Sequence, residues 1–335
     1  MSRYQEAHKN SKGPGDARPT ALQIVEDEGF IGKLTDKVYL VTGVSAGIGI
    51  ETMRALYATG GHVFGTVRNM EKGQKAVDYV KSNTKGGKIT LLEMDNQSLA
   101  SVKKAAEEFS KQSKTLNILV TNAGVMATPE GKTKDGFETQ FGTNHVAHFY
   151  LFQLVKDALL ASSTPELPSR VVSVSSFGHR SGPIRFDDYN FEKEAYNPWA
   201  AYGQAKTANI YLANEIERRF GAKGLHSTSL HPGGIDTNLQ EHVDFSAAMA
   251  NEAVQMYMKS PEQGASTTVY AALSEEWKNK GGKYLSDCVE QPPFSHAEDP
   301  MYVGDDGYAT WAYDEEAAKR LWKESLKMVG LEDDQ

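Results

Sequence analysis

The strongest constraint on the fold is a regular alternation of short apolar runs with longer helical patterns, which begins near Lys37. The apolar runs occupy residues 38–41, 62–66, 89–93, 118–121, 171–175 and 227–231. Strands that alternate with helices at this interval form a parallel sheet with helices on both faces. Because crossovers between parallel strands are right-handed, the sequence predicts an α/β fold with a single doubly wound, Rossmann-type domain.

The same patterns divide the chain into one main domain and two extensions. Residues 1–35 are polar and interrupted by Gly and Pro, with one short helical candidate at 20–28, and we interpret them as an N-terminal appendage. Residues 36–335 form the main domain, of which 290–335 is a C-terminal extension. Long helices are predicted at residues 47–59, 97–113, 136–161, 202–221, 261–276 and 314–328.

The helical pattern loosens in residues 233–260, where apolar residues are spread among polar ones. In a fold of this kind ligands bind beyond the carboxyl ends of the strands, so an apolar insertion after a late strand could cover a substrate. This segment is therefore a candidate substrate lid. The alternative is two ordinary helices packed on the body of the domain.

Composition limits the classes of function. The chain has 335 residues, of which 39% are hydrophobic, enough for one large core, and its net charge of −8 argues against a general nucleic-acid or anionic-membrane surface. Cys288 is the single cysteine, which excludes an internal disulfide and a Cys-x-x-Cys metal or redox motif. His145 and His148 share a helix face but lack a third ligand, so no metal site is predicted. With no signal-peptide pattern at the N-terminus, we expect a soluble cytoplasmic protein.

A glycine-rich turn joins the first predicted strand to the first predicted helix. It reads Thr-Gly-Val-Ser-Ala-Gly-Ile-Gly over residues 42–49. Glycines in this place permit a tight turn and let a pyrophosphate approach the helix N-terminus, where free N–H groups and the helix dipole favour anions. The turn therefore predicts a dinucleotide site.

Arg68 stands at the end of the second strand, where an acidic residue would hold the ribose 2′-hydroxyl of NAD. No acidic residue precedes Glu71, and Arg68 offers a cation for a 2′-phosphate instead. The sequence therefore favours NADP(H), although an arginine after a strand can also be a solvated charge.

Tyr202 and Lys206 are four residues apart at the head of a predicted helix, so both side chains lie on one face. A nearby ammonium favours the ionised form of a phenol, which would make Tyr202 a usable proton donor or acceptor. Tyr189 and Lys193 have the same spacing. Asn190 and the Asn-Pro pair after Tyr196 interrupt a long helix there, so the context favours Tyr202.

Several motifs occur in the order typical of one family. They are the glycine-rich turn at 42–49, Asp95, Thr-Asn-Ala-Gly at 121–124, Asn144, Ser175 with Ser176, Tyr202 with Lys206, and Pro232 with Gly233. In this order, over residues 35–290, the chain resembles the short-chain dehydrogenase/reductase family. The Ser-Ser-Phe-Gly-His stretch and the long insertion before Tyr202 resemble the retinol-dehydrogenase and WW-domain-oxidoreductase branch, without its membrane anchor or WW domains. That branch carries the same kind of insertion, which supports Tyr202 over Tyr189.

The resemblance implies a role for several of these residues. Ser176 would hydrogen-bond the substrate oxygen, and Tyr202 would exchange a proton with it. Lys206 would lower the pKa of Tyr202 and hold the nicotinamide ribose, and Asn144 would position a water on the proton path. The implied cofactor-binding residues are Gly43, Ser45, Gly47, Ile48, Gly49, Arg68, Asp95, Asn122, Ala123, Gly124, Tyr202, Lys206, Pro232, Gly233 and Thr237.

Two positions depart from the family pattern. Thr121 stands where Asn is usual, and Asn96 stands where Leu is common. Neither removes a residue with an implied role, since Asp95 is the expected adenine contact.

The leading interpretation is an NADP(H)-dependent oxidoreductase that acts on the carbonyl or alcohol of a fairly apolar small molecule. The alternatives are an epimerase, dehydratase or cyclase with the same site, and a non-catalytic NADP-binding regulatory protein. Relatives pair through the helices that correspond to 136–161 and 202–221, so a homodimer is expected.

Overall fold

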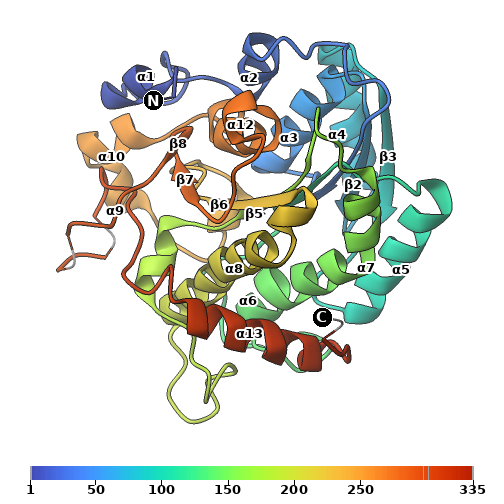
Figure 1. Cartoon of the computed structure of the whole chain (residues 1–335). Coiled ribbons are helices and arrows are strands. Elements are labelled where there is room, and N and C mark those ends of the chain that lie inside the picture. Colours follow the sequence, from blue (N-terminus) through green and yellow to red (C-terminus); the bar gives the residue numbers. More distant parts are fainter. Residues whose placement is uncertain (1, 297, 301, 334–335) are drawn as a thin grey trace.

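A sheet of eight strands forms the centre of the computed structural model, which describes residues 2–296, 298–300 and 302–333 (Figure 1). The strand order is β3-β2-β1-β4-β5-β6-β7-β8, in which β1 to β7 run parallel and β8 is antiparallel to β7. The order reverses between β1 and β4, the place at which folds of this class bind ligands. The strands are β1 Val38–Thr42, β2 His62–Val67, β3 Lys88–Glu93, β4 Ile118–Thr121, β5 Ser169–Val174, β6 Leu225–Leu230, β7 Tyr284–Ser286 and β8 Val289–Glu290.

Helices cover both faces of the sheet because successive strand residues point to opposite sides. In β1, Tyr39 and Val41 belong to the core on one face, and Leu40 belongs to the core on the other. The first face carries α3 Gly47–Ala58, α4 Met70–Asn83 and α12 Ser266–Leu273, and the second carries α5 Leu99–Gln112, α7 Ala147–Ser162 and α8 Pro198–Phe220. The doubly wound α/β fold predicted from the sequence is confirmed.

All six predicted strands are present. The elements without a counterpart among the predicted ranges include α4, β7 and β8. The helix predicted at 136–161 is interrupted by a π-helical turn, and it comprises α6 Thr139–Phe141, the turn Gly142–Val146 and α7. The helix predicted at 261–276 divides into α11 Pro261–Gly264, α12 and a 3₁₀ turn at Glu275–Trp277. The π-helical turn matters for the site below.

The N-terminal extension is part of the packed body, so its interpretation as an appendage is wrong. It contains α1 Gln5–Lys9 and α2 Ala21–Asp27, and Ile24 and Val25 of α2 are fully buried in the core beneath α3 and α12. Figure 1 shows α2 beside α3 and α12. Composition misled here, because a few well-placed apolar residues bury a short helix even in a polar stretch.

The C-terminal helix α13 Glu315–Met328 lies across α7 and α8 (Figure 1). Trp322 is buried at this contact, with its ring centroid 5.0 Å from that of Phe149 in α7 and 6.3 Å from that of Phe220 in α8. The chain itself therefore covers an apolar face of the two helices through which the sequence predicts dimerisation. Apolar residues of these two helices, such as Phe149, Phe152 and Phe220, serve here as core, while the homodimer stays a prediction.

Segment 233–260 contains only short helical pieces, a 3₁₀ turn at Asn238–Gln240, α9 Ser246–Met249 and α10 Glu252–Tyr257. Most of its middle is exposed. Both ends meet at one point, because the backbone N–H of Lys259 donates to the carbonyl of Gly234 at 2.8 Å. Within the described ranges, no helix is both long and apolar enough to cross a bilayer.

Candidate active site

A cleft of about 660 Å³ lies beyond the carboxyl ends of the parallel strands. Of the residues that the sequence assigns to catalysis or to a cofactor, all but Asn144 line it. The lining members are Gly43, Ser45, Gly47, Ile48, Gly49, Arg68, Asp95, Asn122, Ala123, Gly124, Ser176, Tyr202, Lys206, Pro232, Gly233 and Thr237. The structure therefore brings together residues from the ends of several strands.

The glycine-rich turn after β1 leaves room for backbone only. Gly43 and Gly47 have φ of +73° and +58°, in the left-handed region that favours glycine. A Cβ on Gly49 would lie 2.1 Å from the carbonyl oxygen of Gly43. Helix α3 begins at Gly47 without a side-chain cap, so its N-terminal N–H groups face the cleft region uncapped. This cradle fits the pyrophosphate of a dinucleotide.

Thr42 connects this turn to the opposite wall. Its hydroxyl oxygen accepts the backbone N–H groups of Asn122 and Ala123, each at 2.9 Å. Behind it, Nδ1 of His148 donates to the backbone carbonyl of Asn144 at 2.8 Å, which leaves Nε2 as an acceptor for the Thr42 hydroxyl at 2.9 Å. Burial lowers the pKa of His148 to about 4, so the ring is neutral at pH 7 and can accept.

Asn96 completes this buried group. Its Nδ2 donates to the backbone carbonyl of Thr143 at 3.1 Å and lies 3.2 Å from Nε2 of His148. A leucine could not make these contacts. Asn96, which departs from the family pattern, is thus explained by its contact with His148 on α7.

Asn144 lies in the π-helical turn, directly behind the cleft wall. Its Oδ1 accepts the N–H of Val125 and its Nδ2 donates to the carbonyl of Val125, each at 2.9 Å. Its side chain also limits the space at Gly124, where a Cβ would lie 3.1 Å from Oδ1. The observed task of Asn144 is to fix the backbone of the lining residue Val125, and its implied task of holding a water stays a prediction.

Tyr202 and Lys206 lie one turn apart on α8, as their spacing predicts. The helix begins at Pro198, earlier than predicted, where the side chain of Asn197 accepts the N–H groups of residues 199 and 200. Both side chains are only 3% exposed. Nζ of Lys206 lies 5.6 Å from the centre of the Tyr202 ring and donates to the carbonyl of Val174 at 3.1 Å.

Burial dominates the pKa values of this pair. It raises the pKa of Tyr202 to about 12, against a hydrogen bond with Ser176 that lowers it. It lowers the pKa of Lys206 to about 8. The expected lowering of the tyrosine pKa is therefore not the net result here, because loss of hydration penalises the phenolate more than its surroundings stabilise it. At pH 7 Tyr202 is a neutral phenol beside a largely protonated lysine.

Ser176 is held from two sides. Its Oγ accepts the N–H of Gly178 at 3.0 Å, which caps the 3₁₀ turn Phe177–Ser181. A Cβ on Gly178 would lie 2.6 Å from Cε1 of Tyr202, so the glycine lets the tyrosine ring pack against this turn. Nδ1 of His179 donates to the Ser176 carbonyl at 2.6 Å, and its Nε2 accepts the N–H of Ala309 at 2.9 Å. The C-terminal extension thereby supports the serine.

The far end of the cleft carries two cations. Arg68 and Lys72 both line it and are exposed, and within the described part of the chain neither forms a salt bridge. Asp95 lines the same end and binds Lys134 at 2.9 Å. Burial alone would raise the pKa of Asp95, but the hydrogen bonds from Lys134 and from the N–H of Gln97 outweigh it and hold the pKa below its usual value.

The near end of the cleft, around Tyr202, is apolar. Met126, Ala127 and Tyr202 form one buried cluster, with Trp199 and Phe245 packed against it. Further apolar lining comes from segment 233–260 and from the C-terminal extension, namely Leu239, Phe245, Ala248, Met249, Val254, Met258 and Val303.

Tyr189, the competing tyrosine, lies away from the cleft. Its hydroxyl donates to the carboxylate of Glu324 on α13, and its ring stacks on that of Phe141 at 5.0 Å. Residues 189–193 are not helical, as their sequence predicts.

The sequence did not point to Lys72, which lines the cleft, and it pointed to His148, Gly178 and His179 only as parts of larger patterns, without the contacts that they make here. Lys72 is four residues from Arg68. Had the helix at Met70–Asn83 been predicted, this spacing would have indicated a second cation near Arg68. The roles of the two histidines gave no sequence signal, because several of their partners are backbone atoms, at Asn144, Ser176 and Ala309. The side-chain partners of His148, Thr42 and Asn96, are distant from it in the chain.

Comparison with known proteins gives matches over most of the chain. The family model described as short chain dehydrogenase matches residues 37–247. The short-chain dehydrogenase/reductase prx1 of Penicillium roqueforti is 51% identical over 332 residues, which are 98% of this chain and 95% of that protein. Human retinol dehydrogenase 13 is 36% identical over 88% of this chain and 85% of its own length. The crystal structure of an uncharacterized protein from Mycobacterium paratuberculosis superimposes with a TM-score of 0.67 at 30% identity, covering 91% of this chain and 97% of that one.

Proposed function

The chain belongs to the short-chain dehydrogenase/reductase family, and on that basis we propose that it is an NADP(H)-dependent oxidoreductase that interconverts a carbonyl and an alcohol on a fairly apolar small molecule. One observation carries the proposal. A single cleft joins a glycine cradle with two cations at one end to a buried Tyr202, Lys206 and Ser176 at the other.

The two ends of the cleft fit different parts of the cofactor. The uncapped start of α3 would bind the pyrophosphate, and Arg68 with Lys72 would bind a 2′-phosphate through charge-assisted hydrogen bonds. Asp95 would contact the adenine. When bound, the nicotinamide supplies the hydride that reaches the carbonyl carbon.

The residues of this chain supply the proton and hold the substrate oxygen. Tyr202 is protonated at pH 7, so its hydroxyl can donate a proton to the oxygen that becomes an alcohol. Ser176 would hydrogen-bond the same oxygen. Once the proton has left, the ammonium of Lys206 would stabilise the phenolate that remains. In the reverse direction the phenolate would accept the proton.

Segment 233–260 would act as the substrate lid. It supplies Leu239, Phe245 and Met249 to the apolar end of the cleft, while Leu239 and Met249 remain 37% exposed. Apolar side chains left half in solvent can gain burial when an apolar substrate enters. The lid would therefore select apolar molecules and exclude water from the reaction.

The test is consumption of NADPH with a panel of aldehydes and ketones, measured for the purified wild type and for Tyr202→Phe. We expect turnover by the wild type and a loss of about 10²- to 10⁴-fold in Tyr202→Phe, the contribution of a positioned general acid. Affinity for NADPH should change little, since only the phenolic oxygen is lost.

Tyr189→Phe is the matched control, because it removes the same atom from a tyrosine outside the cleft. It should keep most of the activity. If Tyr189→Phe inactivates the enzyme and Tyr202→Phe does not, the site is assigned to the wrong tyrosine. Conversion of a substrate without net NADPH consumption would favour an epimerase, dehydratase or cyclase.

A further inference from the structure

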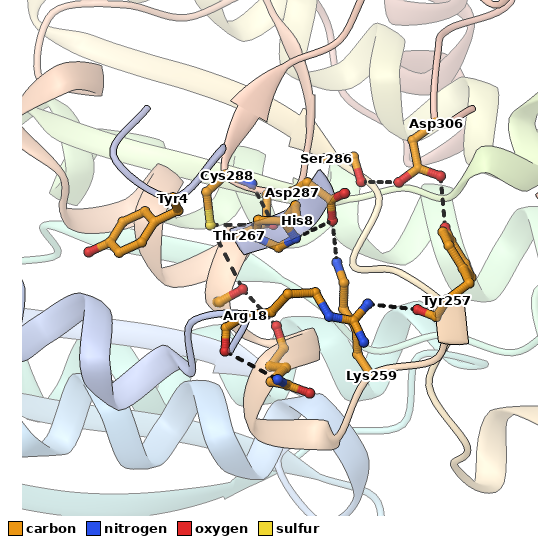
Figure 2. A network of polar contacts seen from close by, with 12 residues as sticks. Tyr4, His8, Arg18, Tyr257, Lys259, Thr267, Ser286, Asp287, Cys288 and Asp306 are labelled. Carbon is orange, nitrogen blue, oxygen red and sulfur yellow. Dashed lines mark hydrogen bonds and ion pairs between the residues drawn. The ribbon is translucent and has the colours of Figure 1, made fainter. Parts of the chain in front are cut away.

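The N-terminal extension contacts the end of segment 233–260 through a buried arginine (Figure 2). Arg18 is 3% exposed. Its Nη1 donates to the carbonyl of Tyr257 at 2.8 Å, and its Nη2 donates to the carbonyls of Met258 at 2.5 Å and Gly13 at 3.1 Å. Its Nε binds the carboxylate of Asp16 at 2.9 Å. A single guanidinium thus joins two carbonyls of one segment to the loop of another.

The loop that carries Arg18 is itself fixed. Nε2 of Gln263, at the start of α11, donates to the carbonyls of Asp16 and Arg18, each at 3.1 Å. Its Oε1 accepts the N–H of Gly15 at 2.9 Å. In addition, the N–H of Gly13 donates to the carbonyl of Met256 at 3.0 Å. The extension therefore has a firm base from which to hold residues 256–258.

A second contact lies beside the first. Nζ of Lys259 binds Asp287 at 2.5 Å and also donates to the carbonyl of Pro232 at 3.3 Å, so it joins the two ends of segment 233–260. Nδ1 of His8, from α1, lies 3.0 Å from the same carboxylate oxygen of Asp287. Figure 2 shows Asp287 joined by dashed lines to both His8 and Lys259, with the Lys259 side chain running beside Arg18.

The residues held in this way are part of the cleft wall, although Arg18 is not. Tyr257 and Met258 line the cleft, and the hydroxyl of Tyr257 binds Asp306 at 2.7 Å and His231 at 2.9 Å. The middle of the segment is exposed and has little packing of its own, so the position of its end must come from contacts outside it.

We infer that the N-terminal extension is a built-in support of the substrate end of the cleft, with Arg18 as the positioning residue that holds Tyr257 and Met258 in place. The inference rests on the proposed function in one respect, that segment 233–260 covers the substrate. It assigns a task to residues 8–18 that the chemistry of the site does not require. Arg18 acts through the backbone of the lid and touches neither the cofactor cradle nor Tyr202.

The first test is hydrogen–deuterium exchange of the full-length protein, which needs no substrate. Arg18→Ala should speed exchange in peptides that cover residues 236–260 by about tenfold or more, because hydrogen bonds from a charged group are lost. Peptides from α3 and β1 should exchange as in the wild type. Arg18→Lys keeps the charge but has fewer donors in the required directions, so it should give a smaller increase in the same peptides.

Arg3→Ala is the matched control. Arg3 lies in the same extension, but its guanidinium is half exposed and binds Glu28 and the carbonyl of Asp27. Its loss should leave exchange in 236–260 unchanged. If Arg18→Ala is folded and exchange there is also unchanged, the inference is wrong. If Arg18→Ala does not fold, Arg18→Lys decides by the same criterion.

The second test uses a carbonyl substrate of the wild type. In Arg18→Ala the KM for the substrate should rise about tenfold, with kcat and the Kd of NADPH within about twofold of the wild type, because the wall is loosened and the catalytic groups are not touched. An equal loss in NADPH affinity would show general destabilisation and overturn the inference. If the wild type reduces no carbonyl, the proposed function fails, but the exchange experiment still decides the role of Arg18.

Discussion

The side-chain amide of Asn144 binds the backbone of Val125 through two hydrogen bonds. Its Oδ1 accepts the N–H of Val125 and its Nδ2 donates to the carbonyl of Val125, each at 2.9 Å. Strand β4 ends at Thr121, so no ladder pairs the backbone at Val125. The side-chain amide of Asn144 supplies the two hydrogen bonds that a neighbouring strand would otherwise make with this backbone. The π-helical turn makes this possible because it places Asn144 at the wall rather than on the regular face of α7.

We therefore expect Asn144→Ala to weaken NADPH binding as well as stability. Two backbone groups of Val125 would lose their partners, at a cost of about 1 to 3 kcal/mol for each group that stays buried. Thermal unfolding and NADPH titration would measure both effects. Asn214→Ala is the control, since Asn214 is a buried asparagine of α8 that binds the carbonyl of Ala312 outside the cleft. It should lower stability and leave NADPH affinity intact, and equal effects of the two changes on affinity would contradict the assignment.

The second prediction concerns the choice of cofactor. NADPH should bind more tightly than NADH. Arg68→Ala and Lys72→Ala should each reduce this difference in affinity, because each removes a charge-assisted contact of about 1.5 to 3 kcal/mol to the 2′-phosphate. Lys75→Ala removes a lysine from the same helix, one already paired with Glu71 at 2.7 Å, and should leave the gap unchanged. The measurement is the Kd of each cofactor. Equal thermal stabilisation of the wild type by NADH and NADPH would contradict the proposed binding of the 2′-phosphate by Arg68 and Lys72.

The third prediction is a pH dependence of stability through His179. Burial is the main cause that lowers the pKa of His179 to about 3, and the nearby Arg180 adds to it against the hydrogen bond to Ser176. Between that value and the unfolded value of about 6.5, the unfolded chain binds a proton that the folded chain does not, so stability falls as the pH falls. The slope from this one group is about 1.4 kcal/mol per pH unit.

Urea unfolding at pH 7 and pH 5 would measure this slope for the wild type and for His179→Gln. We expect the variant to be less stable at pH 7 but to lose less stability on acidification. His145 and His148 are present in both proteins, so their contributions cancel in the comparison. Parallel losses in the two proteins would show that His179 is not a source of the acid sensitivity.

The fourth prediction concerns the contact of α13 with α7 and α8. Trp322→Ala should lower the free energy of unfolding by about 3 to 5 kcal/mol, the usual cost of truncating a buried tryptophan. It should also raise the average molar mass measured by light scattering, because loss of the α13 contact exposes apolar surface of α7 and α8 through which molecules can associate. Met70→Ala, at an exposed residue of α4, should do neither. A stable variant with unchanged mass would mean that α13 is not needed to cover these helices.

Much of the fold was predictable because the strands of a parallel sheet are buried on both faces and read as apolar runs. Val38–Thr42 and Ile118–Thr121 are buried throughout, and their sequences show it. The strand β7 has only three residues and is defined by pairing with β6, so no local pattern reveals it. Helix α4 was missed because only Gly73, Ala76, Val77 and Val80 are buried in an otherwise charged segment.

The candidate site was predictable where its chemistry depends on residue type and order, as for the glycine-rich turn and for Tyr202 with Lys206. It was not predictable where a side chain acts through distant backbone. Arg18 shows this well, since its partners at Tyr257 and Met258 are about 240 residues away in the chain. The pKa of Tyr202 also escaped prediction, because it depends on burial, which spacing does not report.

The cleft described above is built in two different ways along its length. In the glycine-rich turn of the cofactor end, Gly43, Gly47 and Gly49 present only main chain, and a Cβ on Gly43 or Gly49 would collide with Ala123 or with the carbonyl oxygen of Gly43. At the other end the surface consists of long side chains on a segment tied down at its ends. Mutations can therefore remodel the second half without touching the first. If the proposed function holds, a chain of this design can acquire a new substrate during evolution while it keeps the same cofactor and the same proton donor.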